Sequence, residues 1–259
     1  MRCALLSATI GLCTAVAGAQ TPAAAGSPWG TWFIGTVVLP GGARRIGGYV
    51  EAQVRTNALF GQYFYNEVKA GASYDLDPNF TVLVGTGRYT TYQPQALQEG
   101  PVSTEQRLWE QLVLNQYFTR LKIEHRYRVE QRWLSQRDGS DLYRNRLRYR
   151  LNAFLPLNHR SITENTAFVS VYNEVFLNPS GPVFERNRFY AGVGYQAGAH
   201  WVGQLGWLRQ ANFTPATAQL GTFMPAITAT KSNLVFAVTY RLTPRKSAAE
   251  PNGLPSQQD

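Results

Sequence analysis

Arginine occupies alternate positions in the stretch DLYRNRLRYRL, from Arg144 to Arg150. From Leu147 onward, leucine and tyrosine fill the gaps between the arginines. A guanidinium group keeps its charge and presents five donors in a planar fork, which suits ion pairs with carboxylates and the attraction of anions. Because the side chains of a β-strand point alternately to its two faces, the stretch predicts a cationic wall backed by an apolar one.

The preceding segment, 121–134, alternates in the same way and is joined to segment 141–155 by the short loop SQRDGS. The two cationic faces should lie side by side, so acids, water or bound anions must separate their like charges. The basic residues expected to line this interior and attract anions are Lys122, Arg126, Arg128, Arg132, Arg144, Arg146, Arg148, Arg150, Arg186 and Arg188. The expected counter-charges are Glu51, Glu67, Glu124, Glu130 and Glu174. Two uses stay open, a structural Arg/Glu network or a weak anion-preferring passage.

Other side chains give little support for catalysis or metal binding. The three histidines form no HxH, HExxH or Cys/His cluster, and His159 and His200 fit ordinary positions in or beside turns. His125 lies on the apolar face of its segment, where it could serve a lipid-modifying enzyme as a general base, but no serine is suitably placed beside it. We expect no catalytic residue, no metal and no cofactor, with the His125 enzyme kept as an alternative.

The two ends of the chain differ from its body. Residues 1–19 contain one basic residue, an apolar run and a small-x-small end, which is the order of parts in a secretory signal peptide. Both cysteines, Cys3 and Cys13, fall within it, so the mature chain must be held together without disulfides. Residues 20–28 are predicted to form a flexible segment, and residues 243–259 a polar tail.

The formal net charge of the chain is +9, and arginine accounts for most of it. Such a balance can indicate nucleic-acid binding. Here the alternation places the arginines on one face of a sheet, and an exported protein meets few such partners, so we expect no nucleic acid. Candidate ligands are instead small anions.

Residues 29–242 read as β-strands from end to end, separated by breaks rich in Gly, Pro, Asn and Asp. A soluble sandwich and a transmembrane barrel both produce this alternation, but several segments exceed ten residues and carry aromatic residues near their ends, which favours the barrel. We predict an all-β protein, a single antiparallel transmembrane β-barrel of ten to twelve strands in the cell outer membrane. A soluble periplasmic β-protein that binds anions stays open. The predicted strands are 29–39, 45–55, 60–74, 80–92, 104–118, 121–134, 141–155, 165–177, 185–197, 200–211 and 232–242.

The connections predict the topology, with one conflict. Short turns face the periplasm in such barrels and longer loops, here especially 212–231, face outward. From segment 45–55 onward this rule gives ten strands with both ends periplasmic. Segment 29–39 is then an eleventh strand, against the even strand number of single-chain bacterial barrels. Either a strand is missing from the prediction or 29–39 is not an ordinary barrel strand.

The segments LKIEHRYRVEQRW, RNRLRYRLNAFLPLN, VYNEVFLN and ERNRFYAGVGYQ together are distinctive. Over residues 29–242 the chain resembles an uncharacterised family of Gram-negative outer-membrane β-barrel proteins, described as a domain of unknown function (number 2490). The resemblance implies an outer-membrane barrel and supplies no activity or ligand. Because the residues themselves show no catalytic arrangement, we expect a non-enzymatic barrel whose partners are outer-membrane lipid and the barrel-assembly machinery.

Overall fold

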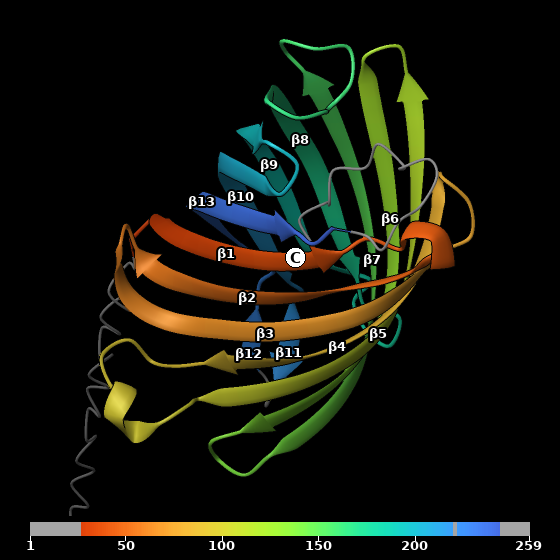
Figure 1. Ribbon diagram of the computed structural model, residues 1–259. Coiled ribbons are helices and arrows are strands. Elements are labelled where there is room, and N and C mark those ends of the chain that lie inside the picture. Colours follow the sequence, from red (N-terminus) through yellow and green to blue (C-terminus); the bar gives the residue numbers. More distant parts are fainter. Residues whose placement is uncertain (1–26, 220–221, 244–259) are drawn as a thin grey trace, which may run out of the picture.

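The computed structural model describes residues 27–219 and 222–243. Eleven long strands close into one barrel, and no helix in these ranges is long and apolar enough to cross a membrane (Figure 1). The barrel strands are β1 (Trp29–Leu39), β2 (Ile46–Ala58), β3 (Gly61–Asp75), β4 (Phe80–Thr91), β5 (Ser103–Phe118), β6 (Leu121–Gln136), β7 (Asp141–Pro156), β8 (Thr166–Leu177), β9 (Phe184–Ala197), β10 (Trp201–Thr214) and β13 (Ile227–Arg241). The remaining elements are two short 3₁₀ turns, η1 (Gly42–Arg44) and η2 (Leu97–Glu99), and the small strands β11 (Thr217–Gln219) and β12 (Thr222–Met224).

The predicted strand boundaries agree closely with these elements, because the breaks have the turn chemistry that their residues suggest. The Asp77 carboxylate accepts hydrogen bonds from the N–H groups of Asn79 (2.7 Å) and Phe80 (2.9 Å) between β3 and β4. Between β6 and β7, Asp138 accepts bonds from the hydroxyl and the N–H of Ser140, which lower the pKa of its carboxyl. Such Asx turns stop the ladder and reverse the chain.

The barrel closes through a parallel pair. Strand β1 pairs in parallel with β13, from Trp29 opposite Ser232 to Val38 opposite Arg241, whereas all other neighbouring strands are antiparallel (Figure 1). In an odd-numbered ring of alternating strands the first and last strands point the same way, so they can pair only in parallel. The eleven mostly antiparallel strands confirm the predicted β-barrel of ten to twelve strands. Segment 29–39 is a full barrel strand, which resolves the conflict over it. The parallel pair also places Trp29 and Arg241 at opposite ends of the barrel.

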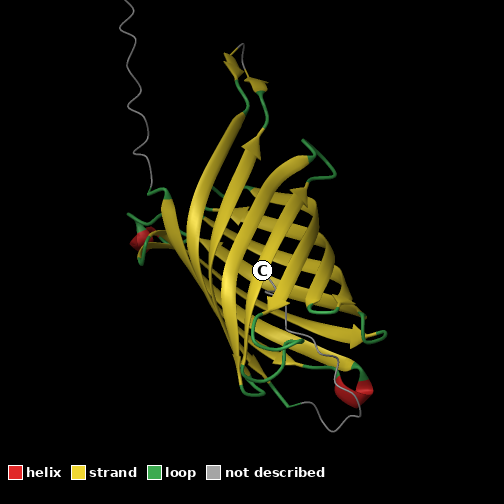
Figure 2. Ribbon diagram, turned by 90° about the horizontal axis from the view of Figure 1, so that it is seen from above, coloured by secondary structure: helices red, strands yellow, loops and turns green. Residues whose placement is uncertain are grey.

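The described residues of region 212–231 continue a hairpin rather than form a loop, which corrects the prediction. Strand β10 runs to Thr214 and pairs there with Ile227 of β13, and β11 and β12 then extend the hairpin. Figure 2 shows it projecting from one end of the barrel. We call this end the hairpin rim; it also carries the β2–β3, β4–β5, β6–β7 and β8–β9 connections. Pro215 and Pro225 interrupt the strand pattern of the sequence at the two places where the ladder pauses.

Inward and outward side chains alternate along the barrel strands, interrupted by one bulge in β3 and one in β9, and the charged face points inward. On β6, Arg126 and Arg128 are 1% and 2% exposed, whereas the outward Tyr127 and Val129 are 47% and 42% exposed. The alternation inferred from the sequence for this strand is therefore confirmed. The polarity is the reverse of a soluble protein, whose apolar side chains lie mostly inside.

Aromatic rings fill the interior between the charged groups. Trp109 lies over Gly85 so closely that a Cβ atom at this position would overlap the indole, and Tyr190 lies in the same way over Gly206 of β10. Tyr172 stacks on Tyr190 with ring centroids 4.9 Å apart. These side chains are almost completely buried, so the middle of the barrel is filled.

Candidate functional site in the barrel interior

The arginine wall predicted from β6 and β7 forms with like charges directly opposite one another. Arg126 lies across the ladder from Arg150, and Arg128 lies across from Arg148. All four side chains are nearly inaccessible to solvent. Buried like charges directly opposite one another are tolerated only if carboxylates and other acceptors surround them.

Glu174 of β8 is one centre of that compensation. Its carboxylate accepts hydrogen bonds from Arg126 and from Arg148 (2.8 and 3.0 Å), and the Arg188 guanidinium lies 4.0 Å away. The three arginines come from β6, β7 and β9, so one fully buried carboxylate connects β8 to three other strands. A carboxylate can accept about four hydrogen bonds, which suits such multiple pairing.

Glu130 of β6 is the second centre, nearer the hairpin rim. Arg148 donates to it at 2.7 Å, and guanidinium nitrogens of Arg128, Arg146 and Arg107 lie at 3.5, 3.7 and 3.9 Å. Arg148 therefore bridges Glu130 and Glu174. Arg128 also donates two bonds to the side-chain oxygen of Gln111, at 2.9 and 2.6 Å.

The other predicted carboxylates pair with cations at two further places inside the barrel. Glu124 lies 3.5 Å from Lys122 and 3.7 Å from Arg150, toward the rim opposite the hairpin. On the β2–β3 wall, Lys69 lies 2.6 Å from Glu51 and 2.7 Å from Glu67. All five glutamates predicted as counter-charges thus lie inside the barrel beside cations.

Two carboxylates of the network escaped the sequence analysis. Glu105 of β5 binds both Arg107 (2.7 Å) and Arg132, and its position two residues before Arg107 on an alternating strand was the available signal. Glu185 of β9 binds Arg146 and lies 3.7 Å from Arg132. It is the extra residue of a β-bulge, which turns it toward its partners against the simple alternation.

Aromatic rings contact guanidinium groups that also pair with carboxylates. Arg55, a cation absent from the predicted set, lies 3.7 Å above the Trp32 ring, and Arg107 lies 3.6 Å above Tyr89. Arg148 lies 4.5 Å from the Phe176 ring. Cation–π contacts of this kind are stronger when water is excluded.

Nine of the ten predicted basic residues line the interior, and they differ in their partners. Arg144 is exposed near the start of β7, outside the packed network. Arg186 donates to the Asn212 side chain at 2.7 Å and lies 5.6 Å from the Phe176 ring. No carboxylate oxygen of the described residues lies within 4.0 Å of the Arg186 guanidinium.

A polar cavity of about 240 Å³ lies inside the barrel toward the hairpin rim; we call it the mouth cavity. Nine cationic side chains and two carboxylates, Glu67 and Glu105, line it. Its aromatic lining includes Trp32 and Phe176. The lining thus contains more cations than carboxylates, and it adjoins the packed network, whose glutamates pair with several of the same arginines.

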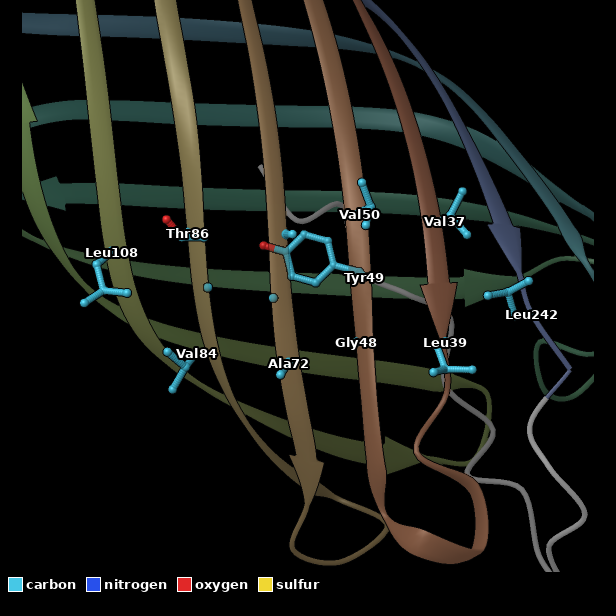
Figure 3. A pocket seen from close by; sticks show the side chains of 13 residues that line it. Val37, Leu39, Gly48, Tyr49, Val50, Ala72, Val84, Thr86, Leu108 and Leu242 are labelled. Atoms are coloured by element: carbon cyan, nitrogen blue, oxygen red, sulfur yellow. The ribbon is translucent and has the colours of Figure 1, made fainter.

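The outward face carries a different hollow. Between β1 and β5, small residues such as Gly48 and Ala72 leave a shallow groove of about 540 Å³, bordered by Val50, Val84 and Leu108 (Figure 3). No charged side chain of the described residues lines it. The groove is a feature of the apolar outer surface and is separate from the ionic interior.

His125 lies on the outward face, as the alternation predicted. Its Nδ1 lies 2.9 Å from the Tyr149 hydroxyl and its Nε2 lies 3.3 Å from the Gln116 side-chain oxygen, so both ring nitrogens have partners. Ser170 lies inside the barrel, bonded to Asn152. Within residues 27–219 and 222–243, no group of three or more His, Cys, Asp or Glu side chains could hold a metal ion.

Fold and interior together define a class of protein: a closed eleven-stranded β-barrel, apolar outside and filled inside by an Arg/Glu network. The chain belongs to the family described as protein of unknown function (DUF2490), whose model matches residues 29–221. No curated protein and no solved structure matches the chain. The family membership agrees with the resemblance seen in the strand motifs and assigns no activity.

Proposed function

We propose that this protein is an integral outer-membrane β-barrel without enzymatic activity, whose Arg/Glu interior closes and stiffens the barrel. The observation that carries the proposal is the inverted polarity, with apolar side chains exposed outside and charged side chains buried inside. Contiguous apolar surface of this extent on a monomer indicates a lipid or protein environment. Outer-membrane lipid and the barrel-assembly machinery are the partners that such a chain requires.

The strand lengths suit a membrane-spanning wall. Strands β5, β6 and β7 each have 16 residues, which at a tilt of about 40° reach roughly 40 Å along the barrel axis. An apolar band of such barrels is about 25 Å tall. The surplus length agrees with the polar outward side chains near the hairpin rim, among them Asn173, Asn187 and Arg209.

The interior favours a structural network over an open passage. Arg126, Arg150, Trp109 and Tyr190 are at most 1% exposed, and they occupy the middle of the barrel from different strands. Salt bridges between β6, β7, β8 and β9 connect the wall across its ladder. We therefore expect the resting barrel to conduct ions poorly.

Membrane fractionation tests the proposal directly. The mature chain should stay with outer membranes after an alkaline carbonate wash, and its mobility on an SDS gel should change on boiling. Release with the soluble periplasmic fraction would support a soluble anion-binding β-protein instead. In planar bilayers we expect no steady conductance, and a stable anion-selective conductance would favour the passage.

The alternative of a lipid-modifying enzyme depends on His125 and has its own test. The hydrogen bonds to Tyr149 and Gln116 explain this residue as part of the outward wall. We expect His125→Ala to leave the outer-membrane lipid composition unchanged. An altered acyl-chain profile in that variant, with normal amounts of folded barrel, would support the alternative of a lipid-modifying enzyme.

A further inference from the structure

The mouth cavity has the features of a built anion site. Its lining side chains come from strands all around the barrel, including β1, β3, β5, β7, β9 and β13. Nine cations and two carboxylates line it, and seven of these cations lie within 4.0 Å of a carboxylate of the lining or of the neighbouring network. A concave surface lined by one sign of charge concentrates counter-ions.

Two of its cations have only neutral partners in the described part of the chain. Arg186 donates to Asn212, and Lys231 of β13 donates to the backbone oxygen of Asn57 at 2.8 Å and to the Asn57 side chain. No described carboxylate oxygen lies within 4.0 Å of either charged group. Their charges are therefore available to a ligand that enters the cavity.

A neutral donor complements these charges. Tyr89 lines the same cavity and is almost completely buried, and its hydroxyl has no hydrogen-bond partner among the described residues. Burying a polar hydroxyl without a partner is unfavourable, so an acceptor from a ligand would remove that cost. An oxyanion supplies several acceptors at once.

The volume limits the size of the ligand. At roughly 30 Å³ per water, 240 Å³ holds about eight water molecules. This is below the range of about 300–1,000 Å³ that is common for drug-sized ligands. The lining belongs to the inside of the barrel, so a small soluble ion can enter where a lipid headgroup in the surrounding bilayer cannot.

We propose that the mouth cavity binds a small, soluble oxyanion with two or more negative charges, of phosphate or carboxylate chemistry. Arg186 and Lys231, which pair with no glutamate of the described residues, supply positive charge to the anion. Tyr89 donates a hydrogen bond to it. The inference rests on the proposed function in one respect only, because the location of the barrel decides which compartment supplies the anion. Binding itself can be measured on the folded barrel in detergent, and so fails or succeeds independently of membrane location.

The test is titration of the purified, detergent-folded mature protein with inorganic pyrophosphate at constant ionic strength. Pyrophosphate should raise the midpoint of thermal unfolding, whereas chloride at the same ionic strength should not. Arg186→Gln and Lys231→Gln should each weaken pyrophosphate binding about tenfold, as expected for loss of one charge-assisted hydrogen bond. Neither substitution breaks an ion pair in the described residues, so both variants are expected to fold.

Arg209→Gln is the matched control, because Arg209 is an exposed arginine on the outward face of β10. It should bind pyrophosphate like the wild type. Equal affinities of the wild type and both cavity variants would overturn the proposal. So would an equal loss in Arg209→Gln, since this would indicate unspecific charge screening.

Chemical protection gives a second measurement that needs no variant. Modification of arginines by phenylglyoxal, read by mass spectrometry, should be slower at Arg186 when pyrophosphate is present and unchanged at Arg209. Unchanged modification at both sites would contradict the proposal. Protection of Arg186 by phosphatidylglycerol vesicles without pyrophosphate would identify a lipid headgroup as the occupant and would overturn the assignment to a soluble anion.

Discussion

The two sides of the barrel interior are filled by different chemistry. The charged wall, formed by β6, β7 and β8, contains Glu130, Glu174 and most of the arginines that surround them. The apolar wall, formed by β1, β10 and β13, presents Trp32, Leu208 and Val235, all at most 3% exposed. Between the two walls, the Arg150 guanidinium lies 5.1 Å from the centre of the Tyr172 ring. The same ring stacks on Tyr190.

The difference shows what each wall demands of its sequence. Apolar packing needs side chains of complementary shape, and it tolerates a slightly imperfect fit at any one of them. A buried ionic network needs every member, because removing one partner leaves an uncompensated charge in a poorly solvated place. The charged wall should therefore respond most strongly to isosteric substitutions, and the apolar wall to changes of volume.

The largest effect is expected from Glu174→Gln. The substitution keeps the shape but removes the charge that Arg126, Arg148 and Arg188 share, and should cost about 3–5 kcal/mol in the free energy of unfolding. Urea unfolding of the folded barrel measures it. Glu110→Gln is the control, because Glu110 faces outward and is exposed; a similar loss in both variants would contradict the role of the network.

On the apolar wall, Leu208→Ala should cost about 2–4 kcal/mol, because it opens a cavity against a side chain that is 1% exposed. The outward Leu205, 45% exposed on the same strand, is the matched control, and Leu205→Ala should cost clearly less. The same unfolding measurement applies. Equal losses would mean that the outward face is packed as tightly as the interior.

Gly206→Ala tests the close approach of Tyr190. The added Cβ atom would overlap the tyrosine ring, so we expect a loss of about 1–3 kcal/mol. Gly203, on the same strand, has open space where a Cβ would lie, and Gly203→Ala should be nearly neutral. If the two alanine variants unfold at the same urea concentration, the ring does not rest on this strand as described.

The smallest effect is expected at the hairpin rim. Glu99 and Arg137 form an ion pair at 2.6 Å, with side chains 62% and 34% exposed. Exposed pairs are worth about 0–1 kcal/mol, so Glu99→Gln should change the unfolding free energy by no more than this. A loss as large as that of Glu174→Gln would show that exposure does not separate the two kinds of ion pair.

The sequence predicts well which side chains of the walls point inward, because polar and apolar residues alternate in it with a period of two. Strands β6 and β7 keep strict alternation over long stretches, and this alone places Arg126, Arg128, Arg148 and Arg150 inside. Local pattern was sufficient in these places.

Other features depend on which strands become neighbours, and local pattern does not contain that information. The parallel pairing of β1 with β13 joins the two ends of the barrel. Two bulges break the alternation: Glu185 is turned toward Arg146, and Phe64, placed by alternation on the outward face, lines the mouth cavity. The mouth cavity itself combines side chains from most of the strands and has no sequence motif.

The central claim is that the apolar outer face lies in lipid while the charged face lies inside the barrel. Since both cysteines fall in the predicted leader, a nitroxide can be attached singly to Val129→Cys or Leu147→Cys in the native membrane. Electron paramagnetic resonance then compares collisions with oxygen, which is enriched in lipid, and with a water-soluble nickel complex. We predict high oxygen and low nickel accessibility at both positions. High nickel accessibility there would contradict the account.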